Sequence, residues 1–283
     1  MSTNKINMIK AKQINYTEAL NAPFNLSVKQ IESFRENGFI KLKDVFTAEV
    51  LEYYSEVITN LVFLLNKNTA PMEKRSTYDK AFLQVFNLWY KDDIVKEFVF
   101  SKRLAKLATD LMGTAGVRLY HDQALYKESG GGITPWHADQ YYWPLESPKT
   151  ITVWIPFQAT PMEMGPLAFA AKSHNYNIGR DLEISDESEK IISEELKAKN
   201  FEYQNTPFDL GEVSFHYGWT FHNAGANTSG IARKVMTMIY MDKDITLSMP
   251  KNKEQLVDWE KWCSLVKIGE TVAGPLNPVL FEY

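Results

Sequence analysis

The chain contains 283 residues, of which 45% are hydrophobic and 23% charged, so it can bury a full core and is unlike a disordered or fibrous sequence. Its 31 basic and 35 acidic side chains give a net charge of −4, which argues against a nucleic-acid or membrane partner, because both attract basic surfaces. The single cysteine, Cys263, excludes intramolecular disulfides and multi-cysteine zinc sites. No apolar run reaches the roughly 18 residues that span a bilayer, and the polar N-terminal stretch lacks the apolar core of a signal peptide. We therefore expect a cytoplasmic globular protein.

The first part of the chain is predicted to form a mostly helical layer over residues 26–113. Residues 1–26 look like an irregular lead-in. Ser27, with Gln30 three positions further on, is typical of a helix N-terminus, and Gly38 suits the C-terminal end of that helix. Two further stretches carry apolar residues at helical spacing; they run from Thr47 to Leu65 and from residue 92 to Gly113.

From residue 116 onwards the pattern changes to short β-rich segments separated by Gly, Pro and Asn. The expected strands cover 117–126, 150–157, 166–171, 211–216 and 233–241. The acidic segment 181–200 is interpreted as an exposed helical insertion, either a solvated face or a lid over an active site. A helical layer followed by many short strands indicates one α+β domain over residues 1–283, mainly β, with a sandwich or barrel at 116–241 and a C-terminal extension at 242–283.

Five histidines are the side chains best suited to metal chemistry. His137 and Asp139 form an H-x-D pair, and on a strand two such side chains share one face. Much later in the chain His222 ends an aromatic segment, a loop follows, and Arg233 opens the next strand beside it. Two histidines and one carboxylate on a β scaffold are typical of the facial triad of non-haem Fe(II) oxygenases. A zinc hydrolase with the same ligands is an alternative, and so is a non-enzymatic jelly-roll binding module with a vestigial site.

These motifs resemble the phytanoyl-CoA dioxygenase (PhyH) family of Fe(II)/2-oxoglutarate-dependent oxygenases. The resemblance runs from about Leu26 to Tyr240 and rests on several blocks in a specific order. The blocks are LSVKQIESFRENGFIKLKDVF, LYHDQALYKESGGGITPWHADQYYWPL, TVWIPFQATPMEMGPLAFAAKSH and the ending H-N-A-G-A-N…R. It implies a double-stranded β-helix (a cupin-like jelly roll) with helices packed outside.

The resemblance also implies roles for individual residues. His137, Asp139 and His222 would be the iron ligands. Arg233 would anchor the distal carboxylate of 2-oxoglutarate, the co-substrate used together with O₂; an arginine suits this role because its planar fork binds carboxylates bidentately and stays charged when buried. Further contacts to the co-substrate are expected from Trp154, Gln123 and Lys127.

One position departs from the family pattern. Two residues after the distal histidine the family often has a serine that contacts the co-substrate, and this chain has Ala224 there. The contact is therefore missing or supplied by Thr228 or Ser229. Candidate contacts to the substrate itself are Trp143, Gln84 and Asn87, the first by strand alternation and the other two by family position.

The other three histidines are expected to be structural. His174 closes a predicted strand, and His121 lies within another whose neighbouring residues face the pocket. His216 competes with His222 as the distal ligand, but the spacing from His222 to Arg233 matches the family and favours His222.

The resemblance implies an enzyme that binds Fe(II), 2-oxoglutarate and O₂, hydroxylates a small organic metabolite and releases succinate and CO₂. Desaturation, epoxidation and ring closure use the same ligands and stay open, whereas an intact Asp139 disfavours halogenation. Hydroxylation of an acyl-CoA is a further alternative, although the chain has no obvious basic cluster for the CoA phosphates and no peroxisomal signal at its C-terminus.

Overall fold

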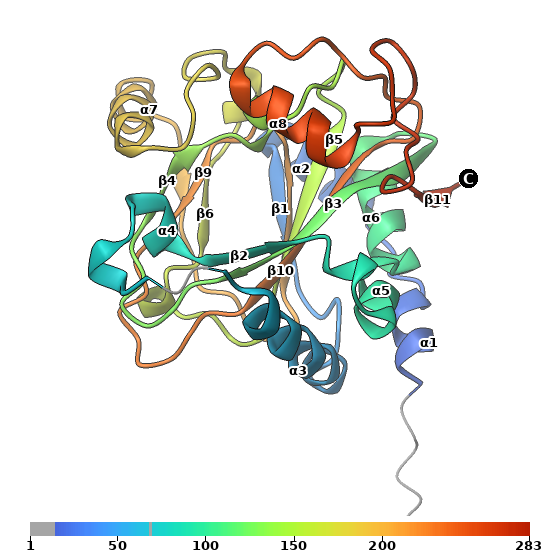
Figure 1. The fold of residues 1–283 in the computed structure, drawn as a ribbon, viewed down its shortest axis with the longest axis horizontal. Helices are drawn as coiled ribbons and strands as arrows, with labels where there is room; N and C mark the ends of the chain where they lie inside the picture. The colour runs from blue at the N-terminus through green and yellow to red at the C-terminus, as the bar shows by residue number, and fades with distance from the viewer. Residues whose placement is uncertain (1–14, 68–69) are drawn as a thin grey trace, which may run out of the picture.

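The computed structural model describes residues 15–67 and 70–283, and within these ranges the strands form two antiparallel sheets that face each other as a jelly roll (Figure 1). In chain order the strands are β1 (Phe39–Leu42), β2 (Leu83–Phe86), β3 (Gly116–Tyr126), β4 (Thr134–His137), β5 (Thr150–Pro156), β6 (Leu167–Ala170), β7 (Tyr203–Gln204), β8 (Val213–Tyr217), β9 (His222–Ala224), β10 (Val235–Asp242) and β11 (Val279–Glu282). The larger sheet has the order β1-β8-β5-β10-β3-β11, with β2 also paired to β3, and the smaller sheet has the order β4-β9-β6-β7.

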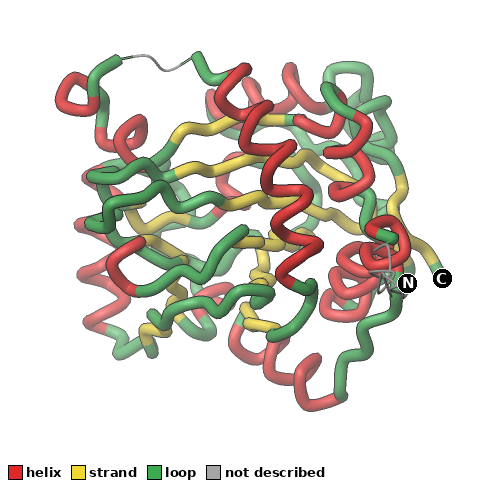
Figure 2. The backbone as a smooth tube through the Cα atoms, turned by 90° about the horizontal axis from the view of Figure 1, so that it is seen from below, coloured by secondary structure: helices red, strands yellow, loops and turns green. Residues whose placement is uncertain are grey.

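Helices cover the outer face of the larger sheet and the ends of the roll. In the described ranges the α-helices are α1 (Tyr16–Asn21), α2 (Val28–Asn37), α3 (Ala48–Leu65), α4 (Thr77–Ala81), α5 (Asp93–Val99), α6 (Lys102–Met112), α7 (Asp186–Ala198) and α8 (Lys253–Trp262). Short 3₁₀ helices are η1 (Met72–Lys74), η2 (Leu88–Tyr90), η3 (Asp139–Tyr142), η4 (Met162–Met164) and η5 (Ser173–Asn175). Figure 2 shows the longest helix, α3, crossing the strands. None of the helices in the described part of the chain is long and apolar enough to cross a membrane.

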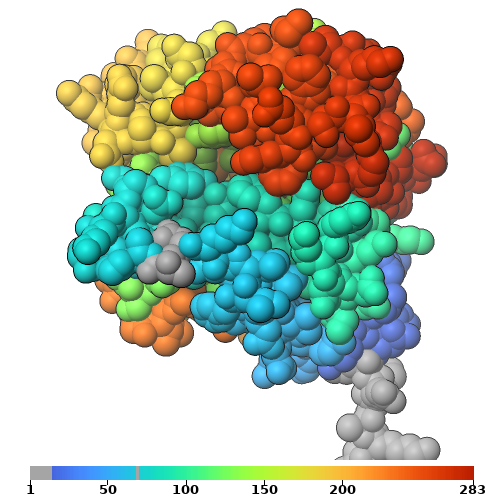
Figure 3. All heavy atoms as spheres, viewed as in Figure 1, coloured from blue at the N-terminus to red at the C-terminus, as the bar shows by residue number. Residues whose placement is uncertain are grey.

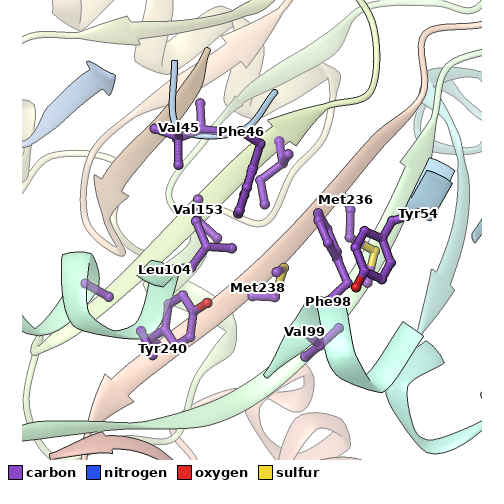
Figure 4. Close-up of a cluster of buried hydrophobic side chains, with 14 of the residues drawn as sticks. Val45, Phe46, Tyr54, Phe98, Val99, Leu104, Val153, Met236, Met238 and Tyr240 are labelled. Carbon is purple, nitrogen blue, oxygen red and sulfur yellow. The ribbon is translucent and has the colours of Figure 1, made fainter. Parts of the chain in front are cut away.

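The main core lies between the larger sheet and the helices outside it. Along β10, the side chains of Met236, Met238 and Tyr240 point towards the helices, where Tyr54 of α3 joins them (Figure 4). Thr237, between the two methionines, faces the opposite way and lines the pocket between the sheets. Alternation along one strand therefore supplies the core on one face and the pocket on the other.

The structure confirms a jelly-roll α+β fold with a helical layer, and the five strands expected from the sequence correspond to β3, β5, β6, β8 and β10. The prediction that residues 1–26 are irregular is wrong in part, because α1 forms at Tyr16–Asn21 with Asn15 as its N-cap. Residues 1–14 lie outside the described residues. The stretch 92–113 is two helices rather than one, because the Ser101 side chain caps a new helix, α6.

The expected helical layer and C-terminal extension both contribute to the sheets. β1 and β2 lie in the segment predicted as a helical layer, and β11 lies in the C-terminal extension. All three strands pair within the larger sheet. These strands are four residues long, too short for alternation to stand out beside the helices around them.

The acidic insertion does form a helix, α7, but the helix is not wholly solvated. Ser188, Ile192 and Leu196 are buried, and the carboxylate of Glu189 accepts a hydrogen bond from the backbone N–H of Trp136 in β4 at 2.9 Å. Besides its exposed acidic face, α7 has an apolar face that packs against the smaller sheet.

Candidate functional site

A pocket opens between the two sheets and encloses about 880 Å³ of space, its open mouth included. We call the part lined by Asp139 and by residues of β4, β5, β9 and the segment just before β10 the inner end. We call the part lined by residues of α4, β2 and α8, together with His121, Tyr142 and Trp143, the outer end. Figure 3 shows the segments that carry α4, α7 and α8, which are distant in sequence, meeting on one face of the molecule.

Three of the predicted residues converge at the inner end. His137 is the last residue of β4 and pairs across the sheet with His222, the first residue of β9. Asp139 starts η3, so the strand has already ended there and simple alternation does not place it. Its Oδ1 nevertheless lies 3.7 Å from Nε2 of His137 and 3.6 Å from Nε2 of His222. Among the described residues these three form a group able to hold a metal ion.

Backbone carbonyls set the orientation of both imidazoles. Nδ1 of His137 lies 2.8 Å from the carbonyl oxygen of Pro135, and Nδ1 of His222 lies 2.9 Å from that of Thr220. A carbonyl only accepts, so Nδ1 carries the hydrogen in each ring and Nε2 presents a lone pair. Burial lowers the pKa of both imidazoles to about 4 and keeps them neutral at pH 7, the form that binds a metal.

The second oxygen of Asp139 is held from outside the triad. Oδ2 accepts a hydrogen bond from the Thr152 hydroxyl at 2.9 Å and lies 3.3 Å from Nε2 of His216. Burial by itself raises the pKa of Asp139, but the imidazoles of His222, His216 and His137 outweigh it and hold the pKa well below its usual range. The carboxylate is therefore ionised, with Oδ1 free to face a cation. Two neutral imidazoles and one oriented carboxylate fit Fe(II).

His216 takes neither role weighed for it from the sequence. The metal-binding group contains His222, and His216 lies on the far side of Asp139, with no partner at its buried Nδ1. The expectation of a purely structural histidine is corrected, because this side chain positions the carboxylate. Strand alternation was a usable signal, since Ser214 and His216 of β8 face away from the outer core residue Phe215.

Arg233 lies at the bottom of the pocket, two residues before β10, with 2% of its surface exposed. One terminal nitrogen donates to the carbonyl oxygen of Gly165, while the buried Nε has no partner among the described residues. The guanidinium lies 5.4 Å from the centroid of the Trp154 ring. Burial lowers its pKa to about 9, so it stays charged at pH 7. An unpaired donor on a buried cation fits the carboxylate of 2-oxoglutarate.

The two glutamines predicted from the sequence both line the pocket and form a chain. The Tyr78 hydroxyl donates to Oε1 of Gln84 at 2.8 Å, and Nε2 of Gln84 donates to Oε1 of Gln123 at 2.5 Å. The bond from Gln84 fixes which side of the Gln123 amide carries the oxygen, and this leaves the amide N–H groups of Gln123 for a ligand in the pocket.

Lys127 and Asn87 lie beside the pocket rather than in its lining. The ammonium of Lys127 donates to the carbonyl oxygens of Gly132 at 2.6 Å and Gly225 at 2.7 Å, so it ties the glycine loop to the loop after β9. Asn87 adopts a left-handed backbone conformation with φ 48° and is buried. Their predicted contacts to co-substrate and substrate stay predictions.

The family's missing serine is not replaced from the following loop. Ala224 lines the pocket, whereas the hydroxyl of Thr228 donates to the carbonyl oxygen of Glu163 and that of Ser229 to Asn227 and Ile231. Neither hydroxyl lines the pocket.

The outer end contains two residues predicted as substrate contacts, Gln84 and Trp143, and two residues that were not predicted to line the site, His121 and Asp258. Trp143 lines it, but as the C-cap of η3 rather than by strand alternation. His121 lines it as well, from the pocket face of β3 that it shares with Gln123, so strand alternation was a signal for its position; its expected structural role stays a prediction. Asp258 reaches the pocket from α8, and nothing in its local sequence indicates this. His174 lies outside the lining, packed on Tyr217.

The fold and the donor set together define a class. The site places two imidazole nitrogens and one carboxylate around a single position, on a jelly roll with a buried arginine. This ligand set and fold are typical of non-haem Fe(II) dioxygenases that use 2-oxoglutarate. The chain belongs to the phytanoyl-CoA dioxygenase (PhyH) family, whose model matches residues 34–235. The predicted family, fold, enzyme class and cofactors are thereby confirmed.

The most informative relatives differ in the reactions that their names describe. A curated protein of Stutzerimonas stutzeri, "Probable alpha-ketoglutarate-dependent hypophosphite dioxygenase", is 24% identical and the match covers 76% of this chain and 79% of that protein. The structure of the carbocyclase SnoK from nogalamycin biosynthesis matches with a TM-score of 0.75 and 23% identity, over 92% of this chain and all of that one. EctD from S. alaskensis, solved with 2-oxoglutarate and 5-hydroxyectoine, matches with a TM-score of 0.68 and 21% identity, over 89% of each chain.

Proposed function

We propose that this dioxygenase hydroxylates a small organic metabolite in the cytoplasm, as one catalytic domain over residues 1–283, with His137, Asp139 and His222 as the iron ligands. The observation that carries the proposal is the convergence of two Nε2 lone pairs on Oδ1 of Asp139, at 3.7 and 3.6 Å. When bound there, iron and 2-oxoglutarate supply the oxidising chemistry that consumes O₂ and releases succinate and CO₂.

The protein's part in this reaction is to bind, orient and exclude water. Thr152 and His216 hold one oxygen of Asp139, so that the other keeps a fixed direction. Arg233 and the N–H groups of Gln123 bind the carboxylate end of 2-oxoglutarate. The outer end of the pocket, with Trp143 as one wall, holds the substrate against the iron position.

The pocket also bears on the substrate. Among its described lining residues Arg233 is the lone Lys or Arg, and it is committed to the co-substrate. This lining offers no further cation for the phosphates of an acyl-CoA or for a small oxyanion. A small metabolite without an anionic group next to the reacting carbon therefore fits best, and nucleic acid is disfavoured by the net charge of −4.

The state of the single cysteine is compatible with the proposed cytoplasmic location. Cys263 is buried, and burial together with the carboxylate of Asp258 raises the pKa of its thiol to about 12, so it is inert towards oxidation. A chain without disulfides suits a reducing compartment.

The test is turnover of 2-oxoglutarate. Purified protein with Fe(II), 2-oxoglutarate and O₂ is expected to form succinate slowly alone and faster with its substrate, and a panel of small metabolites screened this way identifies that substrate. The hydroxylation itself is read by mass spectrometry as the gain of one oxygen atom from ¹⁸O₂; loss of two hydrogens or a change of stereochemistry would replace hydroxylation by desaturation or epimerisation.

A further inference from the structure

The outer end of the pocket contains one charged group that neither iron nor 2-oxoglutarate uses. Asp258, on α8, is the lone carboxylate of the described lining besides Asp139, and the lone Lys or Arg there is Arg233. The other titratable groups of the lining are Tyr78, Tyr142 and four histidines. Burial raises the pKa of both tyrosines, so they stay neutral.

The carboxylate of Asp258 is under-satisfied. It accepts a hydrogen bond from the Tyr120 hydroxyl at 3.2 Å and interacts with the indole N–H of Trp262, whereas two carboxylate oxygens can accept about four hydrogen bonds. No Lys or Arg in the described residues lies within ion-pair distance of it. Burial raises its pKa to about 7 and outweighs the opposite effects of Tyr120, Trp262 and the exposed ammonium of Lys261. The carboxylate therefore lacks a counterion at ion-pair distance.

The neighbouring His121 does not supply that counterion. It is 4% exposed, and burial lowers the pKa of its imidazole to about 4, so it is neutral at pH 7. Its Nδ1 is buried without a partner in the described part of the chain. The imidazole of His121 packs against the rings of Phe86 and Trp262, with centroid distances of 5.5 and 5.2 Å. These contacts fix the position of its polar nitrogen atoms.

Aromatic rings form the rest of this end. Phe82, Phe86, Tyr142 and Trp143 line it. The faces of such rings attract cations, and a carboxylate surrounded by them is the usual composition of sites for ammonium groups. The same surroundings disfavour an anion, which would meet Asp258 with no cation to offset the repulsion.

We propose that the substrate carries a positively charged nitrogen, a protonated amine or a quaternary ammonium, which Asp258 binds at the outer end of the pocket among these aromatic rings. This rests on the proposed function, because the carbon to be oxidised lies between that nitrogen and the iron position. The expected substrate class is thus a small organic cation or zwitterion, and the enzyme is expected to reject oxyanions such as hypophosphite.

The test uses the full chain, without O₂, loaded with Fe(II) and saturating 2-oxoglutarate. Butylamine, 1-butanol and butyrate are titrated in, and then benzylamine, benzyl alcohol and benzoate, so that charge varies while the carbon skeleton is constant. Binding is read from the melting temperature and from the visible band of the loaded site. The amines are expected to bind at least about tenfold more tightly than the matching alcohols, and the carboxylates more weakly still.

Two variants assign the preference to one residue. Asp258→Asn keeps the size of the side chain and removes its charge, and it is expected to abolish the preference for amines. Glu260→Gln removes the same charge from an exposed position of the same helix and is expected to keep the preference.

The inference is overturned if alcohols or carboxylates bind as well as amines, if no amine raises the melting temperature or shifts the band, or if Asp258→Asn keeps the preference. A missing visible band in the wild-type protein counts against the proposed function instead. The melting temperatures still decide the preference for charge in that case.

Discussion

Replacing Arg233 by methionine removes the buried cation at roughly constant volume. One terminal nitrogen is already held by Gly165, and the unpaired Nε leaves one edge of the guanidinium for a carboxylate. Two charge-assisted hydrogen bonds at about 1.5–3 kcal/mol each amount to about 3–6 kcal/mol. At 1.4 kcal/mol for each factor of ten, Arg233→Met should weaken 2-oxoglutarate binding by at least about 100-fold.

The assay is an anaerobic titration of the Fe(II) protein with 2-oxoglutarate, followed by its weak visible charge-transfer band. Arg233→Lys serves as the matched control, since it keeps the charge and loses the planar fork, and its affinity should fall between wild type and Arg233→Met. Melting temperatures establish that each variant is folded. If folded Arg233→Met binds 2-oxoglutarate within about threefold of wild type, the co-substrate does not use this arginine.

Two further predictions concern Asp258 and the histidines. The folded pKa of Asp258 is about 7, above its ordinary value of 3.8, so protonation of this group stabilises the fold below pH 4 and the stabilisation is lost as the pH rises through 7. Asp258→Asn should therefore melt higher than wild type by at least about 3 °C at pH 8, and by less at pH 5. A lower melting temperature at pH 8 would give this carboxylate a structural role instead. His222→Ala should abolish stoichiometric iron binding, whereas His216→Phe should weaken it by about 10–100-fold, measured against a competing chelator. The opposite order would exchange the roles of the two histidines.

Local sequence patterns accounted for the parts of the fold that local physics decides. α2 begins at the capping box of Ser27 and Gln30 and ends at the left-handed Gly38, as the sequence indicated. The long strands, such as β3 and β10, were found because β-rich runs of eight or more residues between Gly, Pro and Asn are typical of strands. β1 and β2 were missed because four residues inside a helical region carry too little periodicity.

The inner end of the site followed from spacing, and the outer end did not. His137, Asp139 and His222 come together because a strand end and a facing strand start bring them to one point, which the family motif encodes. The contribution of Asp258 depends on how α8 folds back over the roll, a tertiary contact with no local signature. The position of His216 behind Asp139 depends on the pairing of β5 with β8, which sets Thr152 opposite His216.

The assignment of this chain as an Fe(II)- and 2-oxoglutarate-dependent enzyme is tested most directly by O₂-dependent succinate formation in the wild-type protein and in His137→Ala. We expect the wild type to convert 2-oxoglutarate to succinate only when Fe(II) and O₂ are both present, and faster with a matching amine. We expect His137→Ala to form none above background while remaining folded. Unchanged succinate formation in His137→Ala, or none in iron-loaded wild type with any substrate, would contradict this assignment.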